Sequence, residues 1–498
     1  MNVNPITRLD YPDPDVIRVE DTYYMVSTTM HFMPGCEILQ SFDLVHWEHA
    51  TYVYETLDHT DAQQLKSGQN IYGQGMWAAS LRYHEGRFYI CFVANDTRKT
   101  YLYTSEKIDG PWKKQLIEGF YHDGSLLFDE DGRNYIVYGN DEIWITELNE
   151  DLTAPKKGGL HRLLVSDHKN PELGYEGSHI QKINGYYYIF LIHSLRDRWM
   201  RTEACFYSDS LEGEFTGGDV LCDDRGYCGQ GVAQGGIVDT PDGKWYAMLF
   251  QDSGAVGRIP ILVPVTWKDH FPFFGQNGHV PEEIEVHSTR PEYIYQPLVG
   301  SDDFCNGLLP RWQFNHDPDP RYYHLDALQG TYTITTREVC TELSQAVNTL
   351  TQRMSYPSCA AEVTVDASAL KEGDVAGLCA LQGCYAAVGI TKHHGKYEVL
   401  MLDKKEDGIL DMTERTVVES HQMDFRLEAD FCNMKDEARC YYRVNKGDWL
   451  PIGTVHKLYI KLENFTGCRF GLFCYAAEET GGSACFRDFK YYDVDEIS

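Results

Sequence analysis

The stretch YEGSHIQKINGYYYIF, residues 175–190, joins an ordinary strand to an unusual beginning. The pair Asn184-Gly185 predicts a turn, and the aromatic and β-branched run after it suits a half-buried strand. Glu176 stands just before the apolar positions begin. A carboxylate placed where a strand enters a core costs free energy unless it is paired or used, so Glu176 raises the question of its role.

The second half of this stretch, GYYYI (185–189), recurs through the first part of the chain as a turn residue, a tyrosine and an apolar run. The other copies are DTYYM (21–25), GRFYI (86–90), GRNYI (132–136) and GKWYA (243–247). The shared tyrosines are Tyr24, Tyr89, Tyr135, Tyr188 and Tyr246, with gaps of 65, 46, 53 and 58 residues. Because this period suits a four-stranded propeller blade with variable loops, five copies predict a five-bladed β-propeller over residues 1–298.

Residues at a fixed distance before each tyrosine are expected to be structurally equivalent. Twelve positions back lie Trp77, Asp123, Glu176 and Gln234, and eleven back in the first unit, whose turn reads one residue shorter, lies Asp13. The innermost strand of each blade lines the central channel, so these residues form a ring around its axis. Three carboxylates in one ring raise at least one pKa, which acid–base chemistry uses and a fold does not need. Turn or cap carboxylates, or a calcium site, are the alternatives.

The composition limits the partners and the compartment. With 44 basic and 75 acidic residues the net charge is −31, which disfavours nucleic acid and acidic membrane surfaces and leaves a neutral ligand open. The fifteen cysteines are odd in number and form no CxxC pair, as in reduced thiols rather than a disulfide framework or zinc site. No signal peptide or long apolar run is recognised, so we expect a cytoplasmic protein, unless a signal peptide has been removed.

The second part of the chain, residues 299–498, reads as a separate β domain. At 498 residues the chain is too long for one ordinary core. Short alternating runs predict strands at YTITT (332–336), CAAEVTV (359–365), YEVLML (397–402) and SHQMDFRLEADF (420–431). A two-sheet, jelly-roll-like β-sandwich is the expected layout, and these runs alone leave its role open.

Several motifs, in order, resemble glycoside hydrolase family 43. They are YPDPDVIRVEDTYYMVST (11–28), SFDLVHWE (41–48), MWAASLRYHEGRFY (76–89), HDGSLLFDEDGRNYIVYG (122–139) and YEGSHIQKINGYYYIF (175–190). SDDF (301–304), NTLTQR (348–353) and GDVAGLCALQGCY (373–385) resemble the β-sandwich of the xylosidase and arabinofuranosidase branch. The resemblance implies an inverting glycosidase on a five-bladed propeller.

The resemblance also implies roles for the ring carboxylates. Asp13 matches the general base that activates water, Glu176 the general acid, and Asp123 the carboxylate that orients the acid and tunes its pKa. Asp15 is the rival for the base, but it has no carboxylate counterpart in the other repeats. An inverting mechanism needs Glu176 to hold its proton near neutral pH, so we expect its pKa to be raised by burial and by nearby negative charge.

Four further residues are expected to contact the substrate. Trp77 suits stacking on a sugar, although a core role is equally open. The resemblance places Phe32 by the pocket and Arg258 against the bound sugar. Gln234 stands where many relatives carry a histidine associated with a central metal or water, so no metal is required, and a structural calcium at the propeller centre stays an open alternative.

These observations predict an exo-acting glycosidase that releases terminal β-D-xylose or α-L-arabinofuranose from hemicellulose-derived oligosaccharides. An arabinan-degrading glycosidase and a non-catalytic sugar-binding propeller are the alternatives, and a homo-oligomer is left open. An exo enzyme needs a blind pocket. We therefore expect the sandwich to pack on the active-site face through a largely apolar interface, and the segment 51–75, with Tyr52, Tyr54 and Tyr72, to help wall the pocket.

Overall fold

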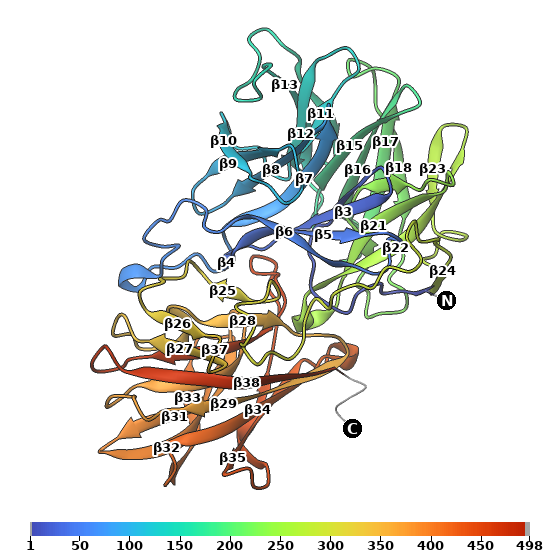
Figure 1. Cartoon of the computed structure of the whole chain (residues 1–498). Helices are drawn as coiled ribbons and strands as arrows, with labels where there is room; N and C mark the ends of the chain where they lie inside the picture. Colours follow the sequence, from blue (N-terminus) through green and yellow to red (C-terminus); the bar gives the residue numbers. More distant parts are fainter. Residues whose placement is uncertain (1, 494–498) are drawn as a thin grey trace.

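The computed structural model describes residues 2–493, which fold as a propeller and a sandwich lying side by side (Figure 1). The helical elements among these residues are the 3-10 turns η1 (Lys66–Gly68), η2 (Gly254–Val256), η3 (Leu343–Gln345) and η4 (Cys432–Met434). Within the described range, no helix has the length and apolar character needed to cross a membrane. All fifteen cysteines are free thiols.

The propeller has five antiparallel sheets in chain order, as predicted. The first contains β2 (Asp15–Val19), β3 (Thr22–Ser27), β5 (Gly35–Ser41) and β6 (Glu48–Tyr54), and the second β7 (Met76–His84), β8 (Arg87–Ala94), β9 (Lys99–Ser105) and β10 (Lys113–Ile117). The third contains β11 (Ser125–Phe128), β12 (Asn134–Asn140), β13 (Glu142–Leu148) and β14 (His161–Ser166), and the fourth β15 (Glu176–Ile183), β16 (Tyr186–Ser194), β17 (Arg201–Ser208) and β18 (Thr216–Leu221). The fifth contains β19 (Val232–Ala233), β20 (Ile237–Asp239), β21 (Trp245–Asp252), β22 (Arg258–Lys268) and β23 (Phe271–Phe274). The pair β1 (Asn2–Val3) and β24 (Glu283–Ile284) joins the two ends of this ring.

The repeated tyrosines lie in the second strand of each blade, and the register explains their distance from the ring residues. The first turn has two residues in blades 1, 2 and 4 and five residues in blades 3 and 5. The tyrosine nevertheless comes seven residues after its cross-strand partner in blades 1, 2 and 4 and eight residues after it in blades 3 and 5, a difference of one. Blades 2 and 4 make up this one residue through a β-bulge after Trp77 and after Glu176. Blade 1 has neither the longer turn nor a β-bulge, so Asp13 is eleven residues before Tyr24. The turn of the first unit, expected to be one residue shorter, is three residues shorter than those of blades 3 and 5 and equal in length to those of blades 2 and 4.

The sandwich consists of two large antiparallel sheets. One has the order β33-β32-β31-β30-β37-β28-β25-β4, and the other β26-β27-β38-β29-β34-β35-β36. The bounds in the first sheet are β4 (Phe32–Met33), β25 (Gln313–Asn315), β28 (Leu350–Arg353), β30 (Val375–Leu381), β31 (Tyr385–His393), β32 (Lys396–Lys404), β33 (Leu410–Val418) and β37 (Arg469–Tyr475). Those in the second are β26 (Tyr323–Asp326), β27 (Thr331–Thr335), β29 (Ser358–Asp366), β34 (Gln422–Asp430), β35 (Glu437–Val444), β36 (Leu450–Lys457) and β38 (Ser483–Asp493). The predicted boundary at 298/299 falls between β24 and β25 and stays a prediction.

The contact between propeller and sandwich is rich in buried charges. The propeller strand β4 pairs with β25 and so extends a sandwich sheet (Figure 1). Arg353 of the sandwich forms an ion pair of 2.8 Å with the buried Glu37, and its Nε donates to the carbonyl oxygen of Asp10. The Asp10 carboxylate accepts from the backbone N–H of Gly467 at 2.7 Å. Buried charges therefore pair across the interface beside apolar contacts, in which Ala255, Val256 and Ile259 pack in the main hydrophobic cluster of the sandwich, and the expectation of a largely apolar interface stays a prediction.

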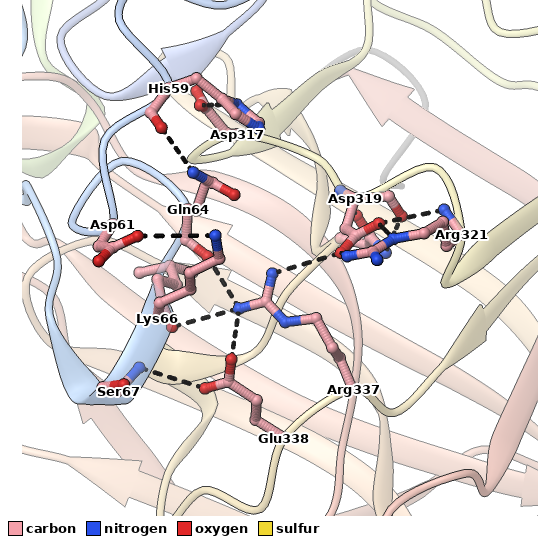
Figure 2. A network of polar contacts seen from close by, with 12 residues as sticks. His59, Asp61, Gln64, Lys66, Ser67, Asp317, Asp319, Arg321, Arg337 and Glu338 are labelled. Carbon is pink, nitrogen blue, oxygen red and sulfur yellow. Dashed lines mark hydrogen bonds and ion pairs between the residues drawn. The ribbon is translucent and has the colours of Figure 1, made fainter.

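The segment between β6 and β7 contacts the sandwich through a second polar network, shown in Figure 2. His59 Nδ1 lies 2.8 Å from Oδ2 of Asp317, and Arg337 donates to the carbonyl oxygen of Gln64 at 2.9 Å. The tyrosines expected to wall the pocket also face the sandwich or the core. Tyr52 donates to Pro310, Tyr72 donates to Ser344, and Tyr54 is buried in the cluster between blades 1 and 2. This segment therefore anchors the sandwich to the propeller.

Candidate active site

The ring residues from all five blades meet at one pocket, of about 270 Å³, at the end of the channel where the inner strands begin. Its wall is formed by Asp13, Trp77, His122, Asp123, Asn140, Leu173, Glu176, Gln234, Arg258, Leu462, Glu463 and Phe465. The last three belong to a loop of the sandwich, before β37. The three predicted carboxylates therefore share one cavity, and the sandwich closes part of it.

Three of the five ring residues share a left-handed backbone conformation. Asp13, Asp123 and Gln234 come just before or between short inner strands and have φ angles of 52°, 48° and 60°. In blade 4 the left-handed residue is Gly177, with φ 63°, directly after Glu176. Because non-glycine residues rarely adopt this region, its repetition at equivalent positions marks a strained and functional part of the fold.

Asp13 is a buried carboxylate held by two short contacts. Its Oδ2 accepts a hydrogen bond of 2.6 Å from the Thr28 hydroxyl, and its Oδ1 forms an ion pair of 2.6 Å with Arg258. The Arg258 guanidinium also contacts Asp252 at 3.2 Å and lies 3.6 Å from the centre of the Phe465 ring. These contacts fix the Asp13 carboxylate at the pocket wall, as a group that activates water requires.

Asp15, the alternative candidate for the general base, lies deeper in the channel, and both of its carboxylate oxygens contact other groups. Arg82 contacts its Oδ2 at 2.7 Å, the backbone N–H of Leu81 donates to the same oxygen at 2.8 Å, and His179 lies 3.1 Å from Oδ1. Burial acts to raise the pKa of Asp15, but Arg82 and His179 outweigh it and lower the pKa to about 2. Asp15 is therefore an ionised structural carboxylate that connects three inner strands.

Asp123, Glu176 and His122 form the charged cluster on the other side of the pocket. Oδ2 of Asp123 accepts a hydrogen bond of 3.0 Å from the backbone N–H of Gly177, and Oε2 of Glu176 accepts one of 2.7 Å from Asn140. Nε2 of His122 lies 3.6 Å from both carboxylates. At that distance the imidazole acts mainly through its charge, because it is beyond strong hydrogen-bond range.

These three groups change each other's affinity for protons. The charge of Asp123 raises the pKa of His122 to about 9, although burial opposes this shift. Burial raises the pKa of Asp123 to about 6, and the charges of Glu176 and Asp13 act in the same direction. Burial also acts to raise the pKa of Glu176, but the contact with His122 and its charge lower that pKa below the ordinary value. The expectation that the pKa of Glu176 is raised is therefore wrong in this structure. The carboxyl group whose pKa is raised is that of its neighbour Asp123.

Two aromatic rings form the apolar side of the pocket. The indole of Trp77 donates to the carbonyl oxygen of Gly73 at 3.2 Å and meets Phe465 edge to face, with ring centres 5.1 Å apart. Because Phe465 also covers Arg258, one sandwich residue contacts both an aromatic and a cationic wall residue. This arrangement suits the apolar face of a sugar beside its polar hydroxyl groups.

The residues near the channel were also compared with the needs of a metal ion. Among residues 2–493, the one group of three His, Cys, Asp or Glu side chains close enough to share an ion is His122, Asp123 and Glu176. Calcium prefers six to eight oxygen ligands, and an imidazole does not suit it. The oxygens of Asp15 near the axis are already engaged. These side chains therefore do not suit a central calcium ion.

Comparison with known proteins agrees with this architecture. Residues 3–272 match the family model described as "Glycosyl hydrolases family 43", and residues 301–492 match "Beta xylosidase C-terminal Concanavalin A-like domain". The chain belongs to glycosyl hydrolase family 43.

Family 43 relatives of this chain carry two kinds of name. A beta-xylosidase from Formosa agariphila is 27% identical over 99% of this chain and 89% of its own length. A non-reducing end alpha-L-arabinofuranosidase from Bacteroides ovatus is 24% identical over 82% of this chain and 79% of its own length. A solved structure described as a bifunctional GH43-CE from Bacteroides eggerthii is 41% identical, with a TM-score of 0.92. That match covers 100% of this chain, which spans 64% of the length of the bifunctional protein.

The structure brings Trp77, Gln234 and Arg258 into the family 43 pocket with the three carboxylates, but it places Phe32 elsewhere. Phe32 is buried in the contact with the sandwich, where its ring lies 3.5 Å from the guanidinium of Arg469. The strand pairing of β4 with β25 draws it there.

The sequence reasoning missed His122, Asn140 and Phe465. His122 directly precedes the ring residue Asp123 in the sequence, and this position could have indicated that it belongs to the pocket. Asn140 and Phe465 carried no signal, because only the fold brings them to the pocket.

Proposed function

We propose that this family 43 protein is an exo-acting inverting glycosidase that removes terminal β-D-xylose or α-L-arabinofuranose from hemicellulose-derived oligosaccharides. The observation that carries the proposal is the meeting of Asp13, Asp123 and Glu176, from three blades, in one pocket that the sandwich walls on one side. The names of the relatives support both sugars, which present similar hydroxyl groups. A pocket of this size suits one sugar unit beyond the cleaved bond better than an open groove would.

In the proposed reaction Asp13 takes a proton from water while Glu176 gives one to the leaving oxygen. An inverting enzyme carries out both transfers in one displacement on opposite faces of the sugar. Asp13 is supplied by blade 1 and Glu176 by blade 4, with Gln234 and Arg258 of blade 5 between them. Asp123 holds the backbone after Glu176 through the Gly177 N–H and so orients the acid.

Substrate binding favours the protonated form of Glu176 that the leaving group needs. In the free protein the contact with His122 and its charge keep the pKa of Glu176 below its ordinary value. A sugar in the pocket excludes water from Glu176, whose side chain is 18% exposed. Because further burial favours the neutral carboxyl, we infer that substrate binding moves a proton onto Glu176.

The compartment remains a proposal. Fifteen free cysteines, nine of them buried, support a reducing environment such as the cytoplasm, where the substrates are short oligosaccharides. Such substrates are neutral, which agrees with a net charge of −31.

A panel of aryl glycosides tests the function. We expect the wild-type protein to release the chromophore from aryl β-D-xylosides or aryl α-L-arabinofuranosides, and proton NMR of the first product to show the anomer opposite to that of the substrate. Release only from arabinan oligomers would favour an arabinan-degrading enzyme. Binding of xylose without release of chromophore from any glycoside would favour a non-catalytic sugar-binding propeller. A product with retained configuration would contradict the assigned roles.

A further inference from the structure

Glu203 is a fully buried carboxyl group that the proposed reaction does not use. It lies in β17 and pairs with Ile192 of β16, which in turn pairs with Glu176 of β15. Glu203 therefore occupies the same cross-strand row as the general acid, two strands outward in blade 4. Carboxyl groups are rarely buried without a partner, so this position needs an explanation.

Glu203 forms a hydrogen bond with one of the ring residues, Gln234. Its Oε2 accepts a hydrogen bond of 2.7 Å from the backbone N–H of Gln234. Its other oxygen, Oε1, is buried without a hydrogen-bond partner in the structure. The nearby cation Arg201 is directed to Asp252, at 3.0 Å, and does not neutralise Glu203. Burial raises the pKa of Glu203 well above its ordinary value.

Gln234 connects Glu203 to the backbone next to Glu176. Its backbone has the left-handed φ of 60°, and its side chain lies against Gly177. A Cβ atom on Gly177 would come within 2.7 Å of the side-chain carbons of Gln234, so the two residues pack as closely as a glycine allows. Gly177 follows Glu176, and its N–H donates to Asp123 at 3.0 Å. A shift of Gln234 would therefore be felt by both carboxyl groups.

We propose that Glu203 is a positioning residue, which fixes the backbone of Gln234 and, through the packing of Gln234 on Gly177, the orientation of Glu176 and Asp123. The proposal rests on the proposed glycosidase function. It makes a buried hydrogen-bond acceptor for the Gln234 N–H the property that position 203 must supply. Glutamine meets this requirement, and methionine has a similar volume but no such acceptor.

The test compares Glu203→Gln with Glu203→Met on two substrates. One is xylobiose, whose leaving group needs protonation, and the other is an activated dinitrophenyl β-D-xyloside, which needs little. We expect Glu203→Gln to keep kcat within about threefold of wild type on both. Glu203→Met is expected to lower kcat on xylobiose by about tenfold or more and to affect the activated substrate much less, with KM nearly unchanged, because misorientation of the acid is felt only where a proton is donated.

Asp374 of the sandwich provides a matched control. It is buried, its Oδ2 accepts a backbone N–H from Lys371 at 2.8 Å, its Oδ1 has no partner, and burial raises its pKa to about 6. Asp374→Asn and Asp374→Leu should show no dependence on the leaving group. Equal losses on both substrates for Glu203→Met, or a loss for Glu203→Gln as large as for Glu203→Met, would overturn the proposal. A wild-type protein that is inactive on aryl xylosides and on aryl arabinofuranosides alike would instead contradict the glycosidase function itself, so the two failures are distinct.

Discussion

The inner strands of the propeller open onto a pocket at each of their ends, about 270 Å³ where the strands begin and about 300 Å³ where they finish. At the second opening, which we call the far mouth, opposite charges are matched. Arg18 lies 2.5 Å from Asp239, and Lys182 lies 2.6 Å from Asp129. The far mouth is the larger of the two pockets, yet among the described residues that line it Asp239 is the one carboxylate.

The pocket at the strand starts differs in how its charges are balanced. Asp123 and Glu176 share one imidazole at 3.6 Å, and the pKa values of all three groups are shifted. Groups with shifted pKa values in a cleft are typical of sites of acid–base chemistry. The matched ion pairs of the far mouth are instead typical of a structural role. The two ends therefore differ in charge balance more than in cavity size, and this difference supports the proposal that the reaction takes place where the strands begin.

The largest expected effect separates Asp13, at the active pocket, from Asp15, inside the channel. Asp13→Ala should lower kcat/KM by on the order of 10³ on every substrate, because a better leaving group does not replace a missing base. Asp15→Asn should instead lower the free energy of unfolding by about 3–5 kcal/mol, because it leaves Arg82 and His179 facing a neutral group in a buried site. Kinetics and thermal unfolding of both variants check this. A larger catalytic loss for folded Asp15→Asn would transfer the base role to Asp15.

The next effect concerns the leaving group. Glu176→Gln should lower kcat on xylo-oligosaccharides by about 10²–10⁴ and should affect dinitrophenyl glycosides far less, because those leave without a proton. Steady-state rates on the two substrate types measure the difference. Glu147, an ion-paired carboxylate at the outside of blade 3, offers a control through Glu147→Gln, which should change neither rate. Equal losses for Glu176→Gln on both substrates would remove it from the acid role.

A smaller effect is a shift in pH dependence. His122 lowers the pKa of Glu176, so His122→Asn should raise that pKa and move the alkaline limb of kcat/KM to higher pH. His84, which stacks on Phe128 at the far mouth, is the matched control, and His84→Asn should leave the profile in place. An alkaline limb that moves to lower pH in His122→Asn would show that the imidazole supports the protonated acid in another way.

The smallest effect is expected at the far mouth itself. Arg18→Gln breaks a partly exposed ion pair, so the free energy of unfolding should fall by about 1 kcal/mol or less. We expect kcat/KM to stay within about twofold of wild type. A tenfold loss of activity without a change in stability would mean that the far mouth takes part in the reaction, and the contrast drawn between the two ends would not hold.

The sequence by itself determined the repeating part of this protein. A turn, a tyrosine and an apolar run define the second strand of each blade, and strand pairing is periodic, so counting back from Tyr135 or Tyr188 reached Asp123 and Glu176. Counting twelve residues back is correct in both blades, although blade 3 has a longer first turn and blade 4 has a β-bulge after Glu176. Local chemistry and the side-chain period of a strand are enough for this kind of inference.

The tertiary structure alone decided the contacts between distant segments and the charges that depend on them. Phe465 reaches the pocket from the sandwich, and Phe32, placed at the pocket by resemblance, is drawn into the strand pairing of β4 with β25. The pKa of Glu176 is lowered, against expectation, by His122 at 3.6 Å. Burial and charge interactions depend on distances in space, which no periodicity in the sequence encodes.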